Sequence, residues 1–150
     1  MVAALTGFTR PITFEGQAAT WLEYLARRAT RDSAEFPCTF TGADIDWRET
    51  LAAVIDARLR GVSPEAIARA FHWSFARATA AAIGVLSESS GVEFIVLSGG
   101  VMQNDLLLAD LRDALARTAV LLWTNREAPP NDGGISLGQA ALAVFAARLS

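Results

Sequence analysis

Two glycine-rich turns carry the residues whose types and spacing are best suited to chemistry. In the first turn, residues 98–101 read Ser-Gly-Gly-Val, and Asn104 follows shortly after it. In the second, residues 130–134 read Pro-Asn-Asp-Gly-Gly and include the carboxylate of Asp132. A glycine turn between a strand and a helix brings bare backbone N–H groups close to a bound anion or base. The pair therefore predicts a nucleotide site at the first turn and a metal or phosphate site at the second.

Both turns also have a purely structural interpretation. A Gly-Gly pair at a strand-to-helix junction often serves close packing alone, and an aspartate before a helix often caps that helix. The sequence contains neither a G-x-G-x-x-G nor a G-x-x-x-x-G-K-[ST] phosphate fingerprint. By themselves, the turns leave a ligand-binding role and a structural role open.

The segments around the turns predict the elements that position them. Residues 92–97 are apolar and rich in β-branched side chains, which is typical of a buried strand, and residues 119–123 repeat the pattern. Asn104 opens an amphipathic helix over 105–118, and a last helix is expected from 134 to about 149. Ligands of a parallel βαβ unit gather at the carboxyl ends of its strands. We therefore expect the two turns to lie side by side at one sheet edge.

The sequence before the first turn predicts a mostly helical structure. Its expected elements are an irregular lead-in over 1–12, a helix over 15–30, a short strand over 36–40, a helix to about residue 60 and a long helix to about residue 87. Asp46 with Glu49 resembles a capping box, and Ser63 followed by Pro64 is a strong helix start. The predicted fold class is α/β, with helices dominant.

Length and composition narrow the function classes. A chain of 150 residues is expected to form one domain with a substantial core. The net charge of -3 argues against a nucleic-acid partner, and no apolar run is long enough for a membrane span. Residues 1–6 are short and lack the basic flank of a signal peptide. With a single cysteine in the chain, a reduced cytoplasmic compartment is the default expectation.

The rarest chemistry-bearing residue types exclude several kinds of site. All 13 basic residues are arginine, which excludes a P-loop lysine and a lysine Schiff base. Cys38 is the only cysteine and His72 the only histidine, so an internal disulfide, a cysteine zinc site and a histidine cluster are excluded. We interpret His72 as a structural, hydrogen-bonded residue.

Four segments resemble one known family. Residues 12–19, 69–72, 97–104 and 129–140 are similar, in the same order, to the carboxyl-terminal end of HypF-type carbamoyltransferases of [NiFe]-hydrogenase maturation. The resemblance covers nearly the whole chain. It implies an enzyme family that makes carbamoyl adenylate from carbamoyl phosphate and ATP. The family then passes the carbamoyl group to the terminal cysteine of a HypE-type partner, for synthesis of a cyanide ligand.

The resemblance also implies a fold. The last module of HypF-like proteins resembles tRNA threonylcarbamoyl-transfer enzymes and has the duplicated fold of actin, sugar kinases and chaperone ATPases (the ASKHA fold). A nucleotide lies in the cleft between its two halves. Residues 1–150 would accordingly form a single domain, the helix-rich second lobe of such a module.

Individual residues take roles by the same resemblance. Gly99 and Gly100 would pack against the adenosine part of ATP or carbamoyl adenylate, and Asn104 would hydrogen-bond the nucleotide. Glu15 and Gly16 fall in a segment that faces the cleft. Glu15 also has the simpler interpretation of a carboxylate favoured by a helix dipole.

Asp132 matches a carboxylate that helps to hold a zinc or iron ion in the family, and a carboxylate suits either metal. The H-x-x-x-H metal motif of the first lobe is absent, and His72 alone cannot supply it. We therefore expect a fragment or a stand-alone second half, with an incomplete metal site and a need for the amino-terminal modules.

Two alternatives stay open at this point. One is half of a tRNA threonylcarbamoyl transferase, although the Pro-Asn-Asp-Gly-Gly string over 130–134 favours HypF. The other is a non-catalytic module that closes its open face by self-association, for example as a homodimer. Whether the isolated chain is itself an enzyme is not decided by the sequence.

Overall fold

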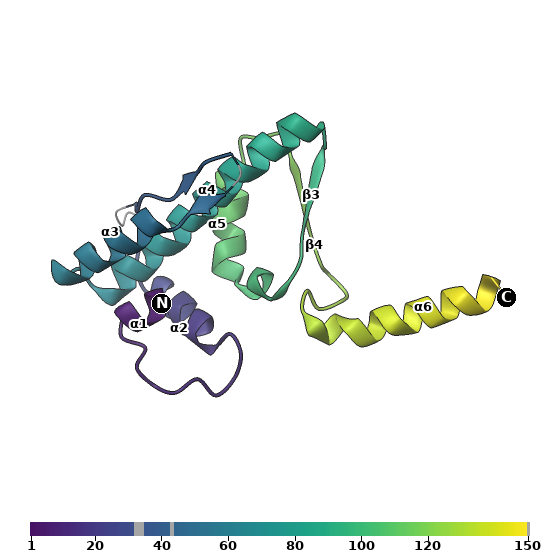
Figure 1. The fold of residues 1–150 in the computed structure, drawn as a ribbon, viewed down its shortest axis with the longest axis horizontal. Coiled ribbons are helices and arrows are strands. Elements are labelled where there is room, and N and C mark those ends of the chain that lie inside the picture. The colour runs from purple at the N-terminus through teal and green to yellow at the C-terminus, as the bar shows by residue number, and fades with distance from the viewer. Residues whose placement is uncertain (32–34, 43, 150) are drawn as a thin grey trace.

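The computed structural model describes residues 1–31, 35–42 and 44–149 (Figure 1). Its helices are α1 (Val2–Leu5), α2 (Gln17–Ala26), α3 (Arg48–Leu59), α4 (Pro64–Ser90), α5 (Asp105–Leu115) and α6 (Ile135–Leu149). Its strands are β1 (Thr39–Phe40), β2 (Ile45–Asp46), β3 (Phe94–Leu97) and β4 (Leu121–Thr124). Two short 3₁₀ segments coincide with the glycine turns: η1 (Gly100–Gln103) begins within the first, and η2 (Asp132–Gly134) lies within the second. The predicted helix-rich α/β class is confirmed.

The long helix α4 organises the fold. It begins where the sequence predicts: the side chain of Ser63 accepts a hydrogen bond from the N–H of Ala66, and Pro64 occupies the first turn. It ends at Gly91, which adopts the left-handed conformation that favours glycine. Helices α2, α3 and α5 all pack against α4 (Figure 1).

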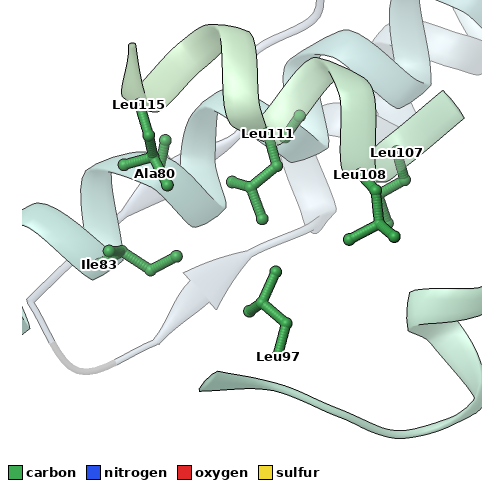
Figure 2. Close-up of a cluster of buried hydrophobic side chains, with 8 residues drawn as sticks. Ala80, Ile83, Leu97, Leu107, Leu108, Leu111 and Leu115 are labelled. Carbon is green, nitrogen blue, oxygen red and sulfur yellow. The ribbon is translucent and has the colours of Figure 1, made fainter. Parts of the chain in front are cut away.

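The core consists of three hydrophobic clusters along α4. The cluster nearest the glycine turns joins α4, α5 and β3, and Figure 2 shows Leu97 of β3 pointing toward Leu111 of α5. A second cluster joins α1 and α2 to α4, and a third joins α3 to α4. Ile67 of α4 and Val54 of α3 are fully buried in the third cluster. Burial along α4 thus holds α5 and β3 in place, and these two elements carry the first glycine turn.

Strands β3 and β4 form a parallel pair whose register aligns Leu97 with Thr124. Helix α5 connects them, so the predicted strand–helix–strand unit is confirmed. Ile95 and Leu122 pack on the core side. The opposite face of the pair is exposed, and there the rings of Phe94 and Trp123 stack with centroids 4.5 Å apart.

Several local expectations are corrected. The lead-in over residues 1–12 contains the short helix α1. The helix expected over 15–30 is shorter at both ends: Gly16, in the left-handed conformation, is its N-cap, and Arg27 is its C-cap. The capping box is wrong: Asp46 Oδ1 accepts from the N–H of Arg48, two residues on, rather than from Glu49. This turn lets Ile45 and Asp46 form β2, an unpredicted strand.

The last helix, α6, extends away from the rest of the chain in Figure 1. Each of its residues from 135 to 147 is exposed, including the large apolar side chains of Leu142 and Phe145. Within the described ranges, none of the helices combines the length and apolar character that crossing a bilayer would need.

Candidate functional site

The two glycine turns meet at the carboxyl ends of the parallel strands. The N–H of Gly99 donates a hydrogen bond to the carbonyl oxygen of Pro130 at 2.6 Å. The first turn follows Leu97 directly and the second follows Thr124 after the loop 125–129, and Leu97 and Thr124 face each other in the register of β3 and β4. The prediction that the turns lie side by side is therefore confirmed.

The first turn has open space beside its glycines. Gly99 has a φ of +98°, a backbone conformation that residues other than glycine rarely adopt. Gly100 has no such constraint, and a Cβ built on Gly100 would meet no atom within 4 Å. Neither backbone conformation nor packing within the described chain therefore requires glycine at position 100. The space beside it is available to a molecule from outside this chain.

The second turn is closed by contrast. A Cβ on Gly134 would lie 2.9 Å from the backbone oxygen of Pro129, and one on Gly133 would lie 3.0 Å from Asn131 Oδ1. The side chain of Asn131 accepts from the N–H of Gly133 and is the N-cap of η2. Glycines in this turn thus serve close packing, and the cap is Asn131 rather than Asp132.

The start of α5 offers fewer free N–H groups than the sequence suggests. The N–H of Leu107 donates to Asn104 Oδ1 at 2.8 Å, so Asn104 is the N-cap, as expected. The N–H of Leu106 donates to Glu23 Oε1 of α2 at 3.3 Å. Protein oxygens therefore occupy two donors that an anion would otherwise use. Glu23 is a site neighbour that sequence reasoning missed, because no local pattern links residues 83 positions apart.

Asn104 is held from the other side by His72 of α4. The amide nitrogen of Asn104 lies 3.1 Å from His72 Nε2, and His72 Nδ1 lies 2.8 Å from the carbonyl oxygen of Ala68. His72 is buried, and that burial lowers the pKa of its imidazole. The structural, hydrogen-bonded interpretation of His72 is confirmed, and its partner is a predicted site residue.

The other two predicted cleft residues lie at the start of α2. Glu15 and Gly16 are both exposed, and Gly16 has a φ of +82°. Within the described part of the chain, no hydrogen bond joins either residue to the glycine turns. Their role at the site stays a prediction.

A cavity of about 430 Å³ lies between the two turns and α5. Its polar lining includes Gln103, Asp105 and Arg112 from the helix side and Thr124 and Asn125 from the end of β4. A second cavity, of about 450 Å³, is mostly apolar and lies among α1, α2, α3 and α4. The polar cavity is the one next to the predicted site.

The metal expectation rests on a single carboxylate. Asp132 is exposed at the start of η2. Across the residues that the structure describes, no group of three or more His, Cys, Asp or Glu side chains is placed to hold a metal ion. Because protein zinc sites use three or four ligands, Asp132 fits a metal only as one contributor to a larger set.

Comparison with protein families supplies a match over most of the chain. Residues 1–139 match the family described as "Carbamoyltransferase, Kae1-like Domain, second subdomain". Carbamoyltransferase HypF of Rhodobacter capsulatus is 38% identical over 131 residues, which are 87% of this chain and 16% of the relative. Carbamoyltransferase HypF of a Synechocystis species is 34% identical over 143 residues, or 92% of this chain and 18% of the relative. The chain thus spans less than a fifth of the length of these relatives.

Two solved structures have a similar fold. Full-length HypF in a phosphate- and nucleotide-bound form superposes with a TM-score of 0.80 and 34% identity, over 95% of this chain and 19% of that one. HypF of T. kodakarensis gives a TM-score of 0.81 at 28% identity, with the same coverage.

Proposed function

The chain belongs to the HypF carbamoyltransferase family, and we propose that it forms the nucleotide-facing half of the module that transfers the carbamoyl group. The reaction would begin with carbamoyl adenylate made from carbamoyl phosphate and ATP. It would end with the carbamoyl group on the terminal cysteine thiol of a HypE-type partner. The remaining modules of a full-length enzyme would supply the steps that this chain does not contain.

The open space at Gly100 is the observation that carries this proposal. A side chain there would meet nothing in the described chain, so the surface beside this glycine, at the turn next to the polar cavity, is open to an external molecule. The flat adenosine part of a nucleotide suits such a surface, since backbone can approach it closely. A similar full-length HypF has been solved in a nucleotide-bound form, which supports a nucleotide as the ligand.

Asn104 has the remaining hydrogen-bonding capacity that this role needs. Its oxygen accepts from Leu107 and its nitrogen approaches His72, which leaves the second amide hydrogen for a ligand. Glu15 and Gly16 would contribute from the start of α2. We further propose that the module is one lobe of the ASKHA fold, with the nucleotide between this lobe and the other.

The described residues of this chain would supply only part of a metal site for the family reaction. Asp132 could contribute one oxygen ligand to zinc or iron, but the described residues provide no complete set. The isolated chain is expected to bind zinc or ferrous ion only weakly.

The test is the binding of ATP to Gly100→Ala. The added methyl group would fill the space that the adenosine needs, so the affinity of the chain for ATP should fall by about tenfold or more, roughly 1.4 kcal/mol. Calorimetric titration measures the affinity, and circular dichroism checks that the fold is unchanged.

Gly84→Ala is the matched control. A Cβ on Gly84 also meets nothing within 4 Å, but Gly84 lies within α4, outside the site. This variant should bind ATP as the wild type does. The proposal is overturned if the wild-type chain fails to bind millimolar ATP, or if Gly100→Ala binds it equally well.

A further inference from the structure

A continuous line of hydrogen bonds runs from Ala68, near the start of α4, to the start of α5. The carbonyl oxygen of Ala68 faces His72 Nδ1 at 2.8 Å, and His72 Nε2 faces the amide nitrogen of Asn104 at 3.1 Å. The amide oxygen of Asn104 in turn accepts from the N–H of Leu107 at 2.8 Å. Each partner in this line restricts the next one.

The chemistry of these groups admits one protonation state. A carbonyl oxygen can only accept, so the hydrogen of the imidazole must lie on Nδ1. Nε2 then has a free lone pair and accepts from Asn104. The amide of Asn104 cannot be reversed, because its oxygen would face the lone pair of Nε2 and its nitrogen would face the N–H of Leu107.

We propose that neutral His72 is a positioning residue, which fixes the orientation of the Asn104 side chain and through it the conformation of the first glycine turn. Asn104 is the C-cap of η1, which begins at Gly100, and the N-cap of α5. An amide held from both sides therefore sets where the turn ends and where the helix begins. We take the ligand at this turn to be the nucleotide of the proposed function. The effect of His72 on ligand binding therefore rests on that proposed function.

Protonation of His72 would break the line. A second hydrogen on Nε2 would face the hydrogens of the Asn104 amide nitrogen, and two donors repel each other. The charged groups that act on the imidazole are Glu23 of α2, Asp110 of α5 and Arg69 of α4 itself. Asp110 and Arg69 are paired with each other, and Glu23 pairs with Arg27.

Burial is the largest influence on the imidazole and lowers its pKa below the usual 6.5. The neutral form is therefore the one present at neutral pH. The turn should loosen only in acid, as the pH falls below 6.5 toward the lowered pKa of His72.

Nuclear magnetic resonance of the 15N-labelled chain tests the positioning directly. The signals of the Gly99 and Gly100 amides and of the Asn104 side chain are followed from neutral pH into acid until the His72 ring has titrated. In the wild type, they should shift with the same midpoint as the His72 ring. A His72 ring that titrates while these signals stay still would overturn the proposal.

Two variants separate positioning from a general effect on the fold. In His72→Gln, the amide oxygen can stand near the position of Nε2, so the turn signals should keep their neutral-pH positions and lose the titration. In His72→Asn, the side chain is too short to reach Asn104, so the signals should be shifted at every pH. Equal turn signals in both variants would contradict the inference.

ATP affinity forms a second arm of the test. His72→Asn should bind ATP about tenfold more weakly than the wild type at neutral pH, whereas His72→Gln should bind it as the wild type does. If the wild type binds no ATP, the proposed function fails, but the resonance experiment still decides whether His72 positions the turn. Wild-type affinity in His72→Asn would overturn the link between positioning and ligand.

Discussion

Arg69 and Asp110 bury opposite charges where α4 meets α5. Both arginine nitrogens lie 2.6 Å from the carboxylate oxygens, and the two side chains are only 6% and 3% exposed. The pair between Asp56 and Arg60, by comparison, is largely exposed. Exposed pairs contribute little to stability, but removing one partner of a buried pair leaves an uncompensated charge.

We predict that Asp110→Asn lowers the free energy of unfolding by about 3–5 kcal/mol, because Arg69 would stay buried without a counter-ion. Urea denaturation measures the loss. Asp56→Asn, which removes the exposed partner of Arg60, should cost less than about 1 kcal/mol and serves as the control. The double variant Arg69→Met with Asp110→Leu should recover much of the stability. Equal, small losses for Asp110→Asn and Asp56→Asn would contradict this account.

At the scale of elements, the two glycine turns differ although their sequences look alike. The first ends at the N-cap Asn104, whose side-chain amide lies against His72 of α4. Glu23 of α2 accepts a further hydrogen bond from the start of α5. The second is held by its own backbone, with Gly134 pressed against Pro129. The Gly99 N–H joins the two through Pro130. A conformational change in the second turn should therefore weaken this hydrogen bond and alter the first turn.

Gly134→Ala should destabilise the second turn. The new Cβ would meet a backbone oxygen at 2.9 Å, which no side-chain rotation can relieve, so a loss of about 1–3 kcal/mol is expected. Hydrogen exchange should also show faster exchange of the Gly99 amide, which donates to Pro130. Gly138→Ala is the control, since a Cβ there meets nothing within 4 Å. Protection of Gly99 that is the same in both variants would refute the coupling.

At the scale of the whole molecule, two apolar surfaces are exposed to solvent within the described part of the chain. One is α6, where Leu142 is 72% and Phe145 68% exposed. The other is the outer face of β3 and β4, with Phe94 and Trp123. Parallel sheets are normally buried on both faces, and large exposed apolar patches usually mark interfaces. In a full-length relative, other modules would be the natural cover.

The isolated chain is therefore expected to self-associate, with a symmetric dimer as the commonest closed form. Light scattering at micromolar concentration should give a mass above that of the monomer. The variant Leu142→Glu with Phe145→Glu should shift the mass toward the monomer, whereas Gln139→Glu on the same helix should not. A monomeric mass that does not change on dilution would count against self-association and against the non-catalytic, self-associating alternative.

The sequence by itself determined the main helices, the strand–helix–strand unit, the N-cap of α4 at Ser63 and the meeting of the two turns. It also determined the family through segments matched in order. The structural features depend on simple patterns: a cap followed by proline, apolar strands, and the rule that parallel strands end at the same sheet edge. The family depends instead on the resemblance of those segments to known sequences. The limits of α2 and the hairpin of β1 and β2 were missed, because weak local signals there compete with turn geometry.

Only the tertiary structure decided how the candidate site is built. His72 and Asn104 are 32 residues apart, and Glu23 and Leu106 are 83 apart, so no local pattern joins them. The sequence also could not distinguish the open Gly100 from the closed Gly134. That difference depends on which atoms lie within a few ångströms of a glycine, and folding alone brings those atoms there.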